Sequence, residues 1–418
     1  MKILYLSTVD IKGGAALGAY RLHRGFLKKG IDSILLVNKK LSDDHTVKGP
    51  ANNFQKMLNA IKPEIQKALL KCQKTPNTFL HSINLFPSGM ARYINQSDVD
   101  FVILHWIGQE MLSIAEIGKI QKPVVWRLAD QWAFSGSEHY VLPEEEIRYI
   151  EGYSRNNRPS DHKGLDVDCW TWQRKKKHWL HKPLTIVTGS RWLAECARKS
   201  YLFKDKVIKA IPSGLDMDIY KPVDKRTARS ILNLPLDKKL ILFGSMSAAS
   251  DKRKGFHLLL PALQAFAENS GVHAAAIIFG ASKPKNPVNF KMPAYYLSVL
   301  QDDWSLVLAY SAADVFILPT MQDNLPYTVM EAMACGTPSI SFNIGGLPDM
   351  IEHEINGYLA EPFDPSDLAN GLTYILNNDA LRKKMSENCR QKALREYNVD
   401  VQVDRYLELF QSIEQNAK

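Results

Sequence analysis

The sequence predicts an α/β protein in which two doubly wound parallel sheets form two separate domains. Short apolar runs of strand length alternate with helical patterns in both halves of the chain, which is the order that builds parallel sheets. The chain has 418 residues, too many for one ordinary core, so two domains of about 200 residues are expected. Its polar and glycine-rich turns follow the apolar runs, at the strand ends where such sheets bind ligands.

The composition is that of an ordinary folded protein, and it argues against several classes. It is 45% hydrophobic and 23% charged, so a mainly disordered chain is not expected. No stretch approaches the roughly 20 apolar residues of a membrane span, and MKILYLSTVD lacks the long apolar core of a signal peptide. We therefore expect a cytoplasmic protein. The five cysteines are scattered, which makes a zinc site or a disulfide framework improbable.

Charge is divided unevenly along the chain. Residues 1–210 carry 33 Lys and Arg against 20 Asp and Glu, whereas the remainder carries 20 against 24. A basic half is expected to face something anionic, such as a membrane surface or a phosphate-bearing lipid, although solubility alone is an alternative. No aromatic and basic recognition module accompanies the charge, so nucleic acid is not expected as a partner.

The first domain is expected to span residues 1–214 and to begin with a strand at 2–9. A glycine-rich turn that includes Gly14 should lead into a helix over 17–29, and a second strand is expected at 34–37. A strand, a Gly-Gly turn and a helix in this order present backbone N–H groups to a phosphate.

A basic amphipathic helix is predicted over residues 54–71. Apolar side chains recur there at helical spacing with lysines between them, at Phe54, Leu58, Ile61, Ile65 and Leu69. Pro63 should kink or split this helix. Such a helix can lie on an anionic membrane, and it can equally pack on its own domain.

Two further strands should end beside polar side chains. The strand at 100–106 includes His105, and the strand at 123–128 is followed by ADQWAFSGSEHY, which contains Asp130. Both residues are candidates for a site, because ligands bind at this edge of a parallel sheet. A lone histidine at a strand end is more often structural.

The rest of this half is polar and basic. Residues 143–168 are expected to form an exposed loop. The four cations at 174–177 most simply form a solvated face, although they could bind a lipid diphosphate. Strands at 185–190 and 207–211 should complete the domain.

The second domain is expected to span residues 215–397. Its first strand should end in Gly244, and the next should end in Gly280, which would leave room for a nucleotide base. Arg253 and Lys254 precede a predicted helix. Cations at a helix N-terminus suit a diphosphate, because the helix dipole and the side-chain charges attract it together. A plain surface turn is the alternative.

The most informative stretch is QDNLPYTVMEAMACGTPSISFNIGGLPD, residues 322–349. After an apolar strand, Pro326 is suited to open a short helix and Gly336 to end it in a left-handed conformation. Glu331 is the only charged side chain of that helix. Its carboxylate either reaches solvent or is buried with a hydrogen-bonding partner, where it could accept from a ligand diol.

The phrase DNLPYTVMEAMACGTP resembles the acidic signature of the retaining GT-B glycosyltransferases of family 4. That signature has two glutamates separated by seven residues, followed by Ala, a small residue and Gly-x-Pro. Glu331 matches the second acid, which the family uses to bind the ribose of a sugar nucleotide. Asp323 takes the place of the first acid, which faces the donor sugar, and its side chain is shorter. Gly345-Gly346 also matches the family.

The first domain resembles the family less closely. Members often read LHDMWPFTGGCHY where this chain has LADQWAFSGSEHY, so Ala129 replaces a histidine that usually contacts substrates. The resemblance places Asp130 on the acceptor side and makes His105 a possible substitute for the missing imidazole. It also brings the Gly14 turn near the donor diphosphate and the acceptor.

The resemblance implies a GT-B fold with two Rossmann-like domains facing across a cleft and a C-terminal helix, 398–418, packed back on the first domain. It implies a retaining transfer of a sugar from a nucleoside diphosphate sugar to a glycan or polyprenyl-linked acceptor, in the synthesis of a capsule or another surface polysaccharide. Asp323 and backbone N–H groups near Asn324 and Leu325 would orient the sugar. Arg253 and Lys254 would neutralise the departing diphosphate.

Because protein cations would balance the diphosphate, no metal and no further cofactor is expected. The protein should be cytoplasmic, with possible peripheral contact at the inner face of the plasma membrane. Two alternatives stay open: a degenerate, non-catalytic protein that binds sugar nucleotides, and a nucleotide-sugar epimerase.

Overall fold

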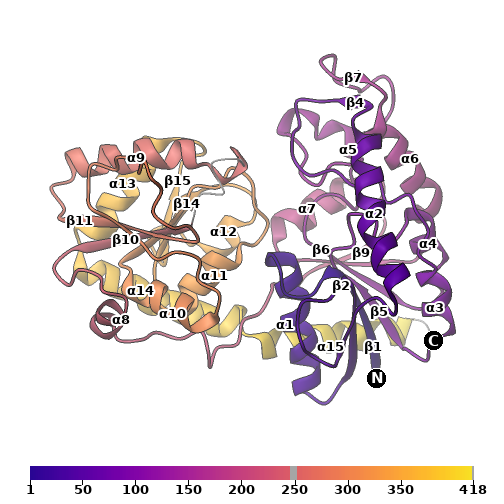
Figure 1. Ribbon diagram of the computed structural model, residues 1–418, viewed down its shortest axis with the longest axis horizontal. Coiled ribbons are helices and arrows are strands. Elements are labelled where there is room, and N and C mark those ends of the chain that lie inside the picture. Colours follow the sequence, from indigo (N-terminus) through magenta and orange to yellow (C-terminus); the bar gives the residue numbers. More distant parts are fainter. Residues whose placement is uncertain (245–251, 417–418) are drawn as a thin grey trace. The chain divides into compact units, whose positions relative to one another are not determined.

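The computed structural model describes residues 1–244 and 252–416. The chain forms two compact units, Met1–Pro212 with Arg405–Lys418, and Ser213–Asp404 (Figure 1). The predicted boundary at 214 lies two residues from this division. The division also falls within the C-terminal helix, α15 (Val399–Asn416), whose first turn and a half belongs to the second unit. That the two sheets face each other across a cleft stays a prediction.

Unit 1 contains a parallel sheet whose strands, in spatial order, are β3 (Val47–Lys48), β2 (Asp32–Lys39), β1 (Lys2–Val9), β5 (Phe101–Leu104), β6 (Val124–Leu128), β8 (Thr185–Thr188) and β9 (Val207–Ala210). Its helices are α1 (Gly14–Lys28), α2 (Asn53–Leu70), α3 (Met90–Gln96), α4 (Ile114–Lys119), α5 (Ile147–Glu151), α6 (Val167–Trp179) and α7 (Arg191–Lys199). A small antiparallel pair, β4 (Gln73–Lys74) with β7 (Lys163–Gly164), lies outside the sheet.

One face of the unit 1 sheet is covered by α1 and by the second part of α15 (Figure 1). Phe26 of α1 contacts Tyr406 edge to face, with ring centroids 6.0 Å apart, and Phe101 of β5 stacks on Phe410 at 4.5 Å. All four rings are buried. The C-terminal segment is therefore part of the hydrophobic core of unit 1.

Two local predictions for unit 1 need correction. Pro63 does not split α2, because on this exposed helix the carbonyl that lacks a backbone partner can be hydrated. A kink at Pro63 stays a prediction. Residues 143–168 do not form an exposed loop, since they contain α5 and bury Arg148, Tyr149 and Tyr153. Arg148 is held in the interior by an ion pair with Asp166 at 2.7 Å.

Unit 2 contains a second parallel sheet, ordered β12 (Ala294–Tyr296), β11 (Ala274–Phe279), β10 (Lys239–Gly244), β13 (Val315–Leu318), β14 (Ser339–Phe342) and β15 (Gly357–Ala360). Its helices are α8 (Lys225–Ile231), α9 (Phe256–Asn269), α10 (Asp303–Ala312), α11 (Tyr327–Ala334), α12 (Leu347–Met350), α13 (Pro365–Leu376) and α14 (Asp379–Glu396). A 3₁₀ turn, η3 (Lys252–Lys254), precedes α9.

The unit 2 sheet is buried on both faces, as expected for parallel strands between two helical layers. Successive residues of β10 point to opposite sides, so Leu240 and Leu242 pack in one core cluster and Ile241 and Phe243 in the other. Figure 1 shows α9 and α13 on one face and α10, α11 and α14 on the other. The carboxyl ends of β10, β11 and β13 consequently lie side by side at one edge.

Candidate functional site

The candidate site in unit 2 is built from the segments that follow β10 and β13. Two hydrogen bonds to the backbone carbonyl of Arg253 hold these segments together. The Met321 N–H donates to it at 2.7 Å, and the Thr320 hydroxyl donates to it at 3.2 Å. Gly255 makes this approach possible. It adopts φ +70°, and a Cβ there would lie 1.8 Å from the Pro319 carbonyl oxygen, so no side chain fits.

Arg253, Lys254 and Asp323 converge at this junction, although each cation is 69 residues away in the chain from the residue that it contacts. The Arg253 guanidinium donates to the Gln322 carbonyl at 2.9 Å and lies 3.9 Å from Asp323 Oδ2. The Lys254 ammonium lies 3.3 Å from the same carboxylate oxygen. The side chain of Arg253 is 11% exposed, that of Lys254 is 37% exposed and that of Asp323 is 18% exposed, so all three are accessible to a ligand.

The Asp323 carboxylate also organises its own loop. Its Oδ1 accepts from the Asn324 N–H at 2.9 Å, and its backbone carbonyl accepts from the Gly346 N–H at 3.1 Å. One of the N–H groups expected to orient the sugar is therefore engaged by Asp323. The side chain of Leu325 is buried in the core cluster shared by α10 and α11, so only its backbone could serve a ligand.

Glu331 lies on α11 and is only 5% exposed. The carboxylate is therefore buried with a hydrogen-bonding partner and does not reach solvent. The Tyr310 hydroxyl, from α10, donates to Glu331 Oε2 at 3.2 Å. Burial and then the charge of Glu331 raise the pKa of Tyr310 well above its ordinary value, so the phenol stays a donor. Gly336 ends α11 with φ +74°, as its position in the sequence predicts.

The two strand-end glycines of unit 2 lie on neighbouring strands. Gly244 ends β10 and is in register with Phe279 of β11, directly before Gly280. Gly280 adopts φ +87° and donates its N–H to the Ser298 carbonyl at 2.6 Å. Both therefore lie at the same sheet edge as the loop that carries Asp323.

In unit 1 the glycine turn stands where the sequence places it. Gly13 has φ +91° and precedes Gly14, the first residue of α1, so the helix starts three residues earlier than predicted. Gly14 is exposed, and the first backbone N–H groups of a helix have no partner within it. The turn can therefore accept an anion.

His105 and Asp130 lie in a buried polar network. His105 Nδ1 is 3.3 Å from the Tyr5 hydroxyl, and burial, with a contribution from Arg127, holds the pKa of His105 well below its ordinary value. Asp130 Oδ2 accepts from His139 Nδ1 at 2.7 Å. Burial acts to raise the pKa of Asp130, but the charge and hydrogen bond of His139 outweigh it, and the pKa is lowered. Both residues also line a small pocket together with Ala129 and His139, and a role for them toward an acceptor stays a prediction.

Unit 1 also has a hollow of about 900 Å³ at the carboxyl ends of β1 and β2, beside α2. Its lining includes Lys39, Lys40 and Lys56 as well as polar groups such as Thr8 and Asn59. Several cations in one concave surface suit a phosphate-bearing ligand. This hollow is not predictable from the sequence, because its wall combines strand ends with a helix that is distant in the chain.

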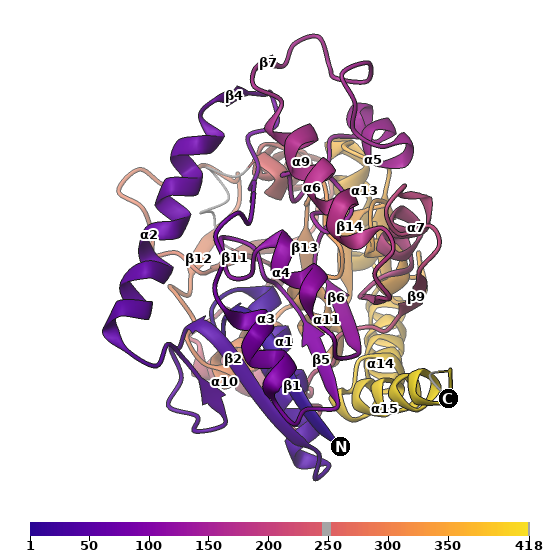
Figure 2. The same ribbon diagram turned by 90° about the vertical axis from the view of Figure 1, so that its right-hand side faces the viewer.

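Figure 2 looks onto unit 1 and shows α2 running along one side toward β4. Five apolar side chains of α2 are between 38% and 63% exposed: Phe54, Met57, Ile61, Ile65 and Leu69. Their spacing of three and four residues places them on one helical face. The sequence leaves two alternatives for the apolar face of α2: contact with a membrane, or packing on its own domain. In the structure this face does not pack on unit 1. No helix in the described ranges is long and apolar enough to cross a bilayer.

Comparison with known proteins agrees with this architecture. Residues 224–392 match the model of the family Glycosyl transferases group 1. D-inositol 3-phosphate glycosyltransferase of Saccharomonospora viridis is 26% identical over 202 residues, which cover 45% of this chain and 46% of that protein. UDP-Gal:alpha-D-GlcNAc-diphosphoundecaprenol alpha-1,3-galactosyltransferase of Escherichia coli is 24% identical over 223 residues, covering 51% and 56%. The chain thus matches about half the length of these relatives.

Among solved structures, sucrose-phosphate synthase from Thermosynechococcus elongatus superimposes with a TM-score of 0.66 over 99% of both chains at 17% identity. Likeness at this identity establishes the fold, which is two Rossmann-like domains of GT-B type, and nothing further. Residues 224–392, which match the glycosyl transferases group 1 model, contain Arg253, Lys254, Asp323 and Glu331, and the chain has the GT-B fold.

Proposed function

We propose that this chain is a retaining glycosyltransferase that moves a sugar from a nucleoside diphosphate sugar to a glycan or lipid-linked acceptor. The observation that carries the proposal is the convergence of Arg253 and Lys254 on the loop of Asp323, at the carboxyl edge of the unit 2 sheet. Two accessible cations at this edge supply a place for a diphosphate, and Glu331 lies on the helix that follows the same loop.

In this reaction the bond between the anomeric carbon and the diphosphate breaks, and positive charge develops on the sugar. Arg253 and Lys254 would bind the diphosphate as its negative charge increases, which lowers the barrier directly. Asp323 would exchange its ion pairs with these cations for contacts to the donor sugar. Glu331, held at one oxygen by Tyr310, would accept from the ribose hydroxyls through the other.

The acceptor is proposed to be lipid-linked. The basic hollow of unit 1 suits a phosphate group, and the exposed apolar face of α2 beside it suits the surface of a membrane. The Escherichia coli relative is named for a diphosphoundecaprenol acceptor. We therefore propose peripheral contact with an anionic membrane and a role in the assembly of a surface polysaccharide. No metal is needed for the transfer in this scheme, because the protein supplies the cations.

The test is a thermal-shift screen of the full chain against UDP, GDP, ADP and their common sugars, followed by a transfer assay with the donor that binds. We expect one nucleotide sugar to raise the melting temperature by several degrees. Glu331→Gln should abolish the rise, because the neutral amide keeps the Tyr310 hydrogen bond but loses the charge that binds the diol. Glu352→Gln is the matched control, since this partly exposed carboxylate pairs with Lys392. The absence of any shift at millimolar nucleotide would contradict the proposal.

A non-catalytic sugar-nucleotide-binding protein is the second candidate. One observation favours it: the Asn324 N–H, which would serve the donor sugar, is engaged by the shorter Asp323. This candidate predicts nucleotide binding with neither transfer nor slow hydrolysis of the donor. In the catalytic case, the anomeric configuration of the product, measured by NMR, should equal that of the donor.

A further inference from the structure

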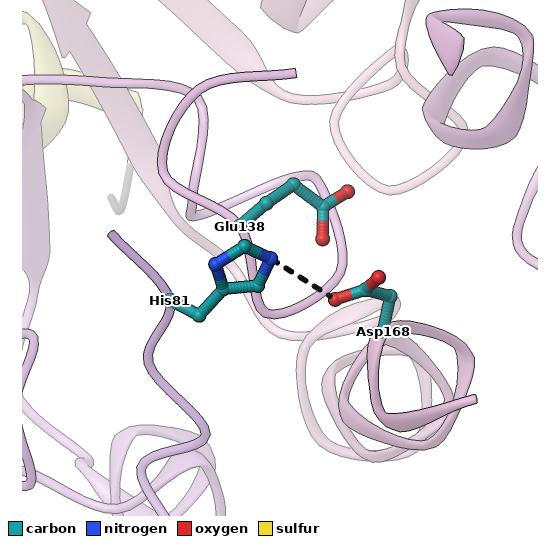
Figure 3. Close-up of side chains that lie close together, drawn as sticks. All are labelled: His81, Glu138 and Asp168. Carbon is teal, nitrogen blue, oxygen red and sulfur yellow. Dashed lines mark ion pairs between the residues drawn. The ribbon is translucent and has the colours of Figure 1, made fainter. Parts of the chain in front are cut away.

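Three buried side chains from separate segments of unit 1 point toward one another (Figure 3). His81 and Glu138 face each other across an isolated antiparallel bridge, and Asp168 lies in the first turn of α6. One ligand atom of each residue lies within 4.8 Å of the other two, and His81 Nε2 is 3.9 Å from Asp168 Oδ1. None of these residues takes part in the donor site proposed above.

Two of the atoms in this cluster have no hydrogen-bond partner within the described part of the chain. His81 Nδ1 donates to the Phe79 carbonyl at 2.8 Å, so Nε2 presents a lone pair, and it is unpartnered. Glu138 Oε2 is unpartnered as well. The His81 side chain is 10% exposed and Glu138 is 2% exposed. Burying a hydrogen-bond acceptor without a donor costs free energy of folding. In this cluster His81 Nε2 and Glu138 Oε2 face the carboxylate of Asp168, and all three groups are acceptors.

We propose that His81, Glu138 and Asp168 bind a structural divalent transition-metal ion, and that Zn²⁺ is the preferred ion. One imidazole nitrogen and two carboxylate oxygens are a ligand set that Zn²⁺ accepts, with a water or another small ligand completing four-coordination. The sequence argued against zinc only through its scattered cysteines, and this site uses none. The proposal does not depend on the proposed glycosyl transfer.

The surroundings of the cluster are those of a metal site, since each ligand is held by a second group. The Phe79 carbonyl fixes the ring of His81. The Tyr153 hydroxyl and the Gly136 N–H donate to Glu138 Oε1, which leaves Oε2 directed into the cluster. Asp168 accepts from Gln73 Nε2 at 2.6 Å and from the Ser137 hydroxyl.

Metal binding requires the three ligand atoms, which lie within 4.8 Å of one another, to move closer together. Ligand atoms bound to a tetrahedral Zn²⁺ at about 2.0–2.1 Å lie about 3.3 Å from each other. The distance between His81 Nε2 and Asp168 Oδ1 is 3.9 Å, so the two atoms would approach by about half an ångström, which a χ rotation supplies. The Arg148 guanidinium lies 3.9 Å from the other oxygen of Asp168.

A bound ion would tie together three parts of unit 1: the segment after β4, the loop that carries His139, and α6. A shared proton between the Glu138 and Asp168 carboxyl groups is the rival occupant, because two adjacent buried carboxylates do not both ionise without a cation. The two occupants give opposite results for Glu138→Gln, whose amide mimics the protonated acid but is a poor metal ligand.

The experiment uses the full chain, purified without chelator, with metal content measured by mass spectrometry and stability by melting temperature. We expect about one equivalent of Zn²⁺ per chain, a melting temperature several degrees lower after EDTA treatment, and recovery on adding Zn²⁺ alone. Glu138→Gln should hold little zinc and should no longer respond to EDTA. His162→Gln is the matched control: it alters a buried histidine and carboxylate pair, His162 with Glu145 at 3.0 Å, for which the described residues supply no third His, Cys, Asp or Glu ligand. It should keep its zinc.

Three outcomes would overturn the proposal: a metal-free wild-type chain that does not bind added Zn²⁺, a Glu138→Gln chain as stable as the wild type with no EDTA response in either, or equal loss of zinc in His162→Gln. If Glu138→Gln does not fold, titration of EDTA-treated wild type against a zinc indicator decides between one saturable site and none. Zn²⁺ taken up weakly at many equivalents would count as adventitious binding and against the site.

Discussion

In unit 2, Arg253, Lys254 and Asp323 meet at one junction, whereas in unit 1 His105 and Asp130 are tied to neighbouring side chains. The two cations are expected to bind the diphosphate and Asp323 the sugar, and each cation lies within 3.9 Å of Asp323 Oδ2. His105 and Asp130 are expected at the site from similar strand-end positions, yet His105 contacts Tyr5, and Asp130 accepts from Trp106 and His139. A strand-end position therefore predicts the edge of the sheet, but it does not predict whether the side chain faces a ligand.

The difference has a physical origin in the segments that follow the strands. In unit 2 a glycine lets two of these segments touch through their backbones, which leaves their side chains at the surface. In unit 1 the segments after β5 and β6 are long and pack on each other, so their polar groups must find partners inside. The predictions below test this contrast, from the largest expected effect to the smallest.

The largest effect is expected from Gly255→Ala. Its Cβ would overlap the Pro319 carbonyl oxygen, so the contact between the two site segments must open, and we expect a loss of about 4 kcal/mol or more in the free energy of unfolding. Gly271→Ala is the control, because Gly271 is also left-handed at φ +66° but has nothing within 4 Å of its added Cβ. It should cost about 1–2 kcal/mol. Equal urea midpoints for the two variants would show that the close approach is unimportant.

Lys254→Met should lower kcat/KM for transfer by roughly 10²–10³-fold, the usual effect of removing one group that stabilises transition-state charge. The substitution keeps the length of the side chain and removes its charge. Lys252→Met, in the same 3₁₀ turn, changes the net charge equally and should leave the rate within a few-fold. Steady-state kinetics with the identified donor provide the measurement. Similar losses in both variants would reduce the role of Lys254 to general electrostatics.

Acid should destabilise unit 1 through His23, which is fully buried between the Ser33 and Thr46 hydroxyls. Burial lowers the pKa of His23 from 6.5 to about 4. Between these values the unfolded chain binds the extra proton, so stability falls as the pH drops from about 6.5 to 4, by roughly 3 kcal/mol in total. Urea unfolding across this range should show the slope. His23→Gln should reduce this slope, to which buried His105 also contributes, and His45→Gln, at an exposed histidine, should leave it unchanged.

The smallest effect is expected at α2. Phe54→Ser combined with Ile61→Ser removes apolar area from its exposed face and should weaken binding to phosphatidylglycerol vesicles by about tenfold or more. Val207→Ser changes an exposed apolar residue on β9 and should leave vesicle binding unaltered. Sedimentation with vesicles measures both. If neutral phosphatidylcholine vesicles bind as well as anionic ones, the lysines beside this face do not contribute.

The sequence predicts regular elements well where the apolar pattern is strong. The first strand is expected at 2–9 and is found at Lys2–Val9, and the strand expected at 123–128 is found at Val124–Leu128. Family resemblance assigns both the Arg253 turn and the Asp323 loop to the donor. Because both segments lead away from the carboxyl ends of neighbouring parallel strands, this part of the site is predictable.

Partners distant in sequence are not predictable in this way. Tyr310 as the partner of Glu331 leaves no signal, because α10 and α11 meet only in the folded unit. Within the cationic run at 174–177, Lys175 is fully buried and donates to the Trp132, Ser135 and Gly136 carbonyls, so a run of like charges concealed one interior residue. His81, Glu138 and Asp168 share no spacing that a linear pattern could reveal.

The contribution of α15 to the core of unit 1 has a consequence for biosynthesis. The aromatic surface of Phe26 and Phe101 stays exposed on the nascent chain until Tyr406 and Phe410 have left the ribosome, after all of unit 2 has been translated. Unit 1 therefore cannot complete its core before unit 2 is synthesised, although N-terminal domains usually fold first. Chaperones that bind exposed aromatic side chains consequently have more time to bind the nascent chain.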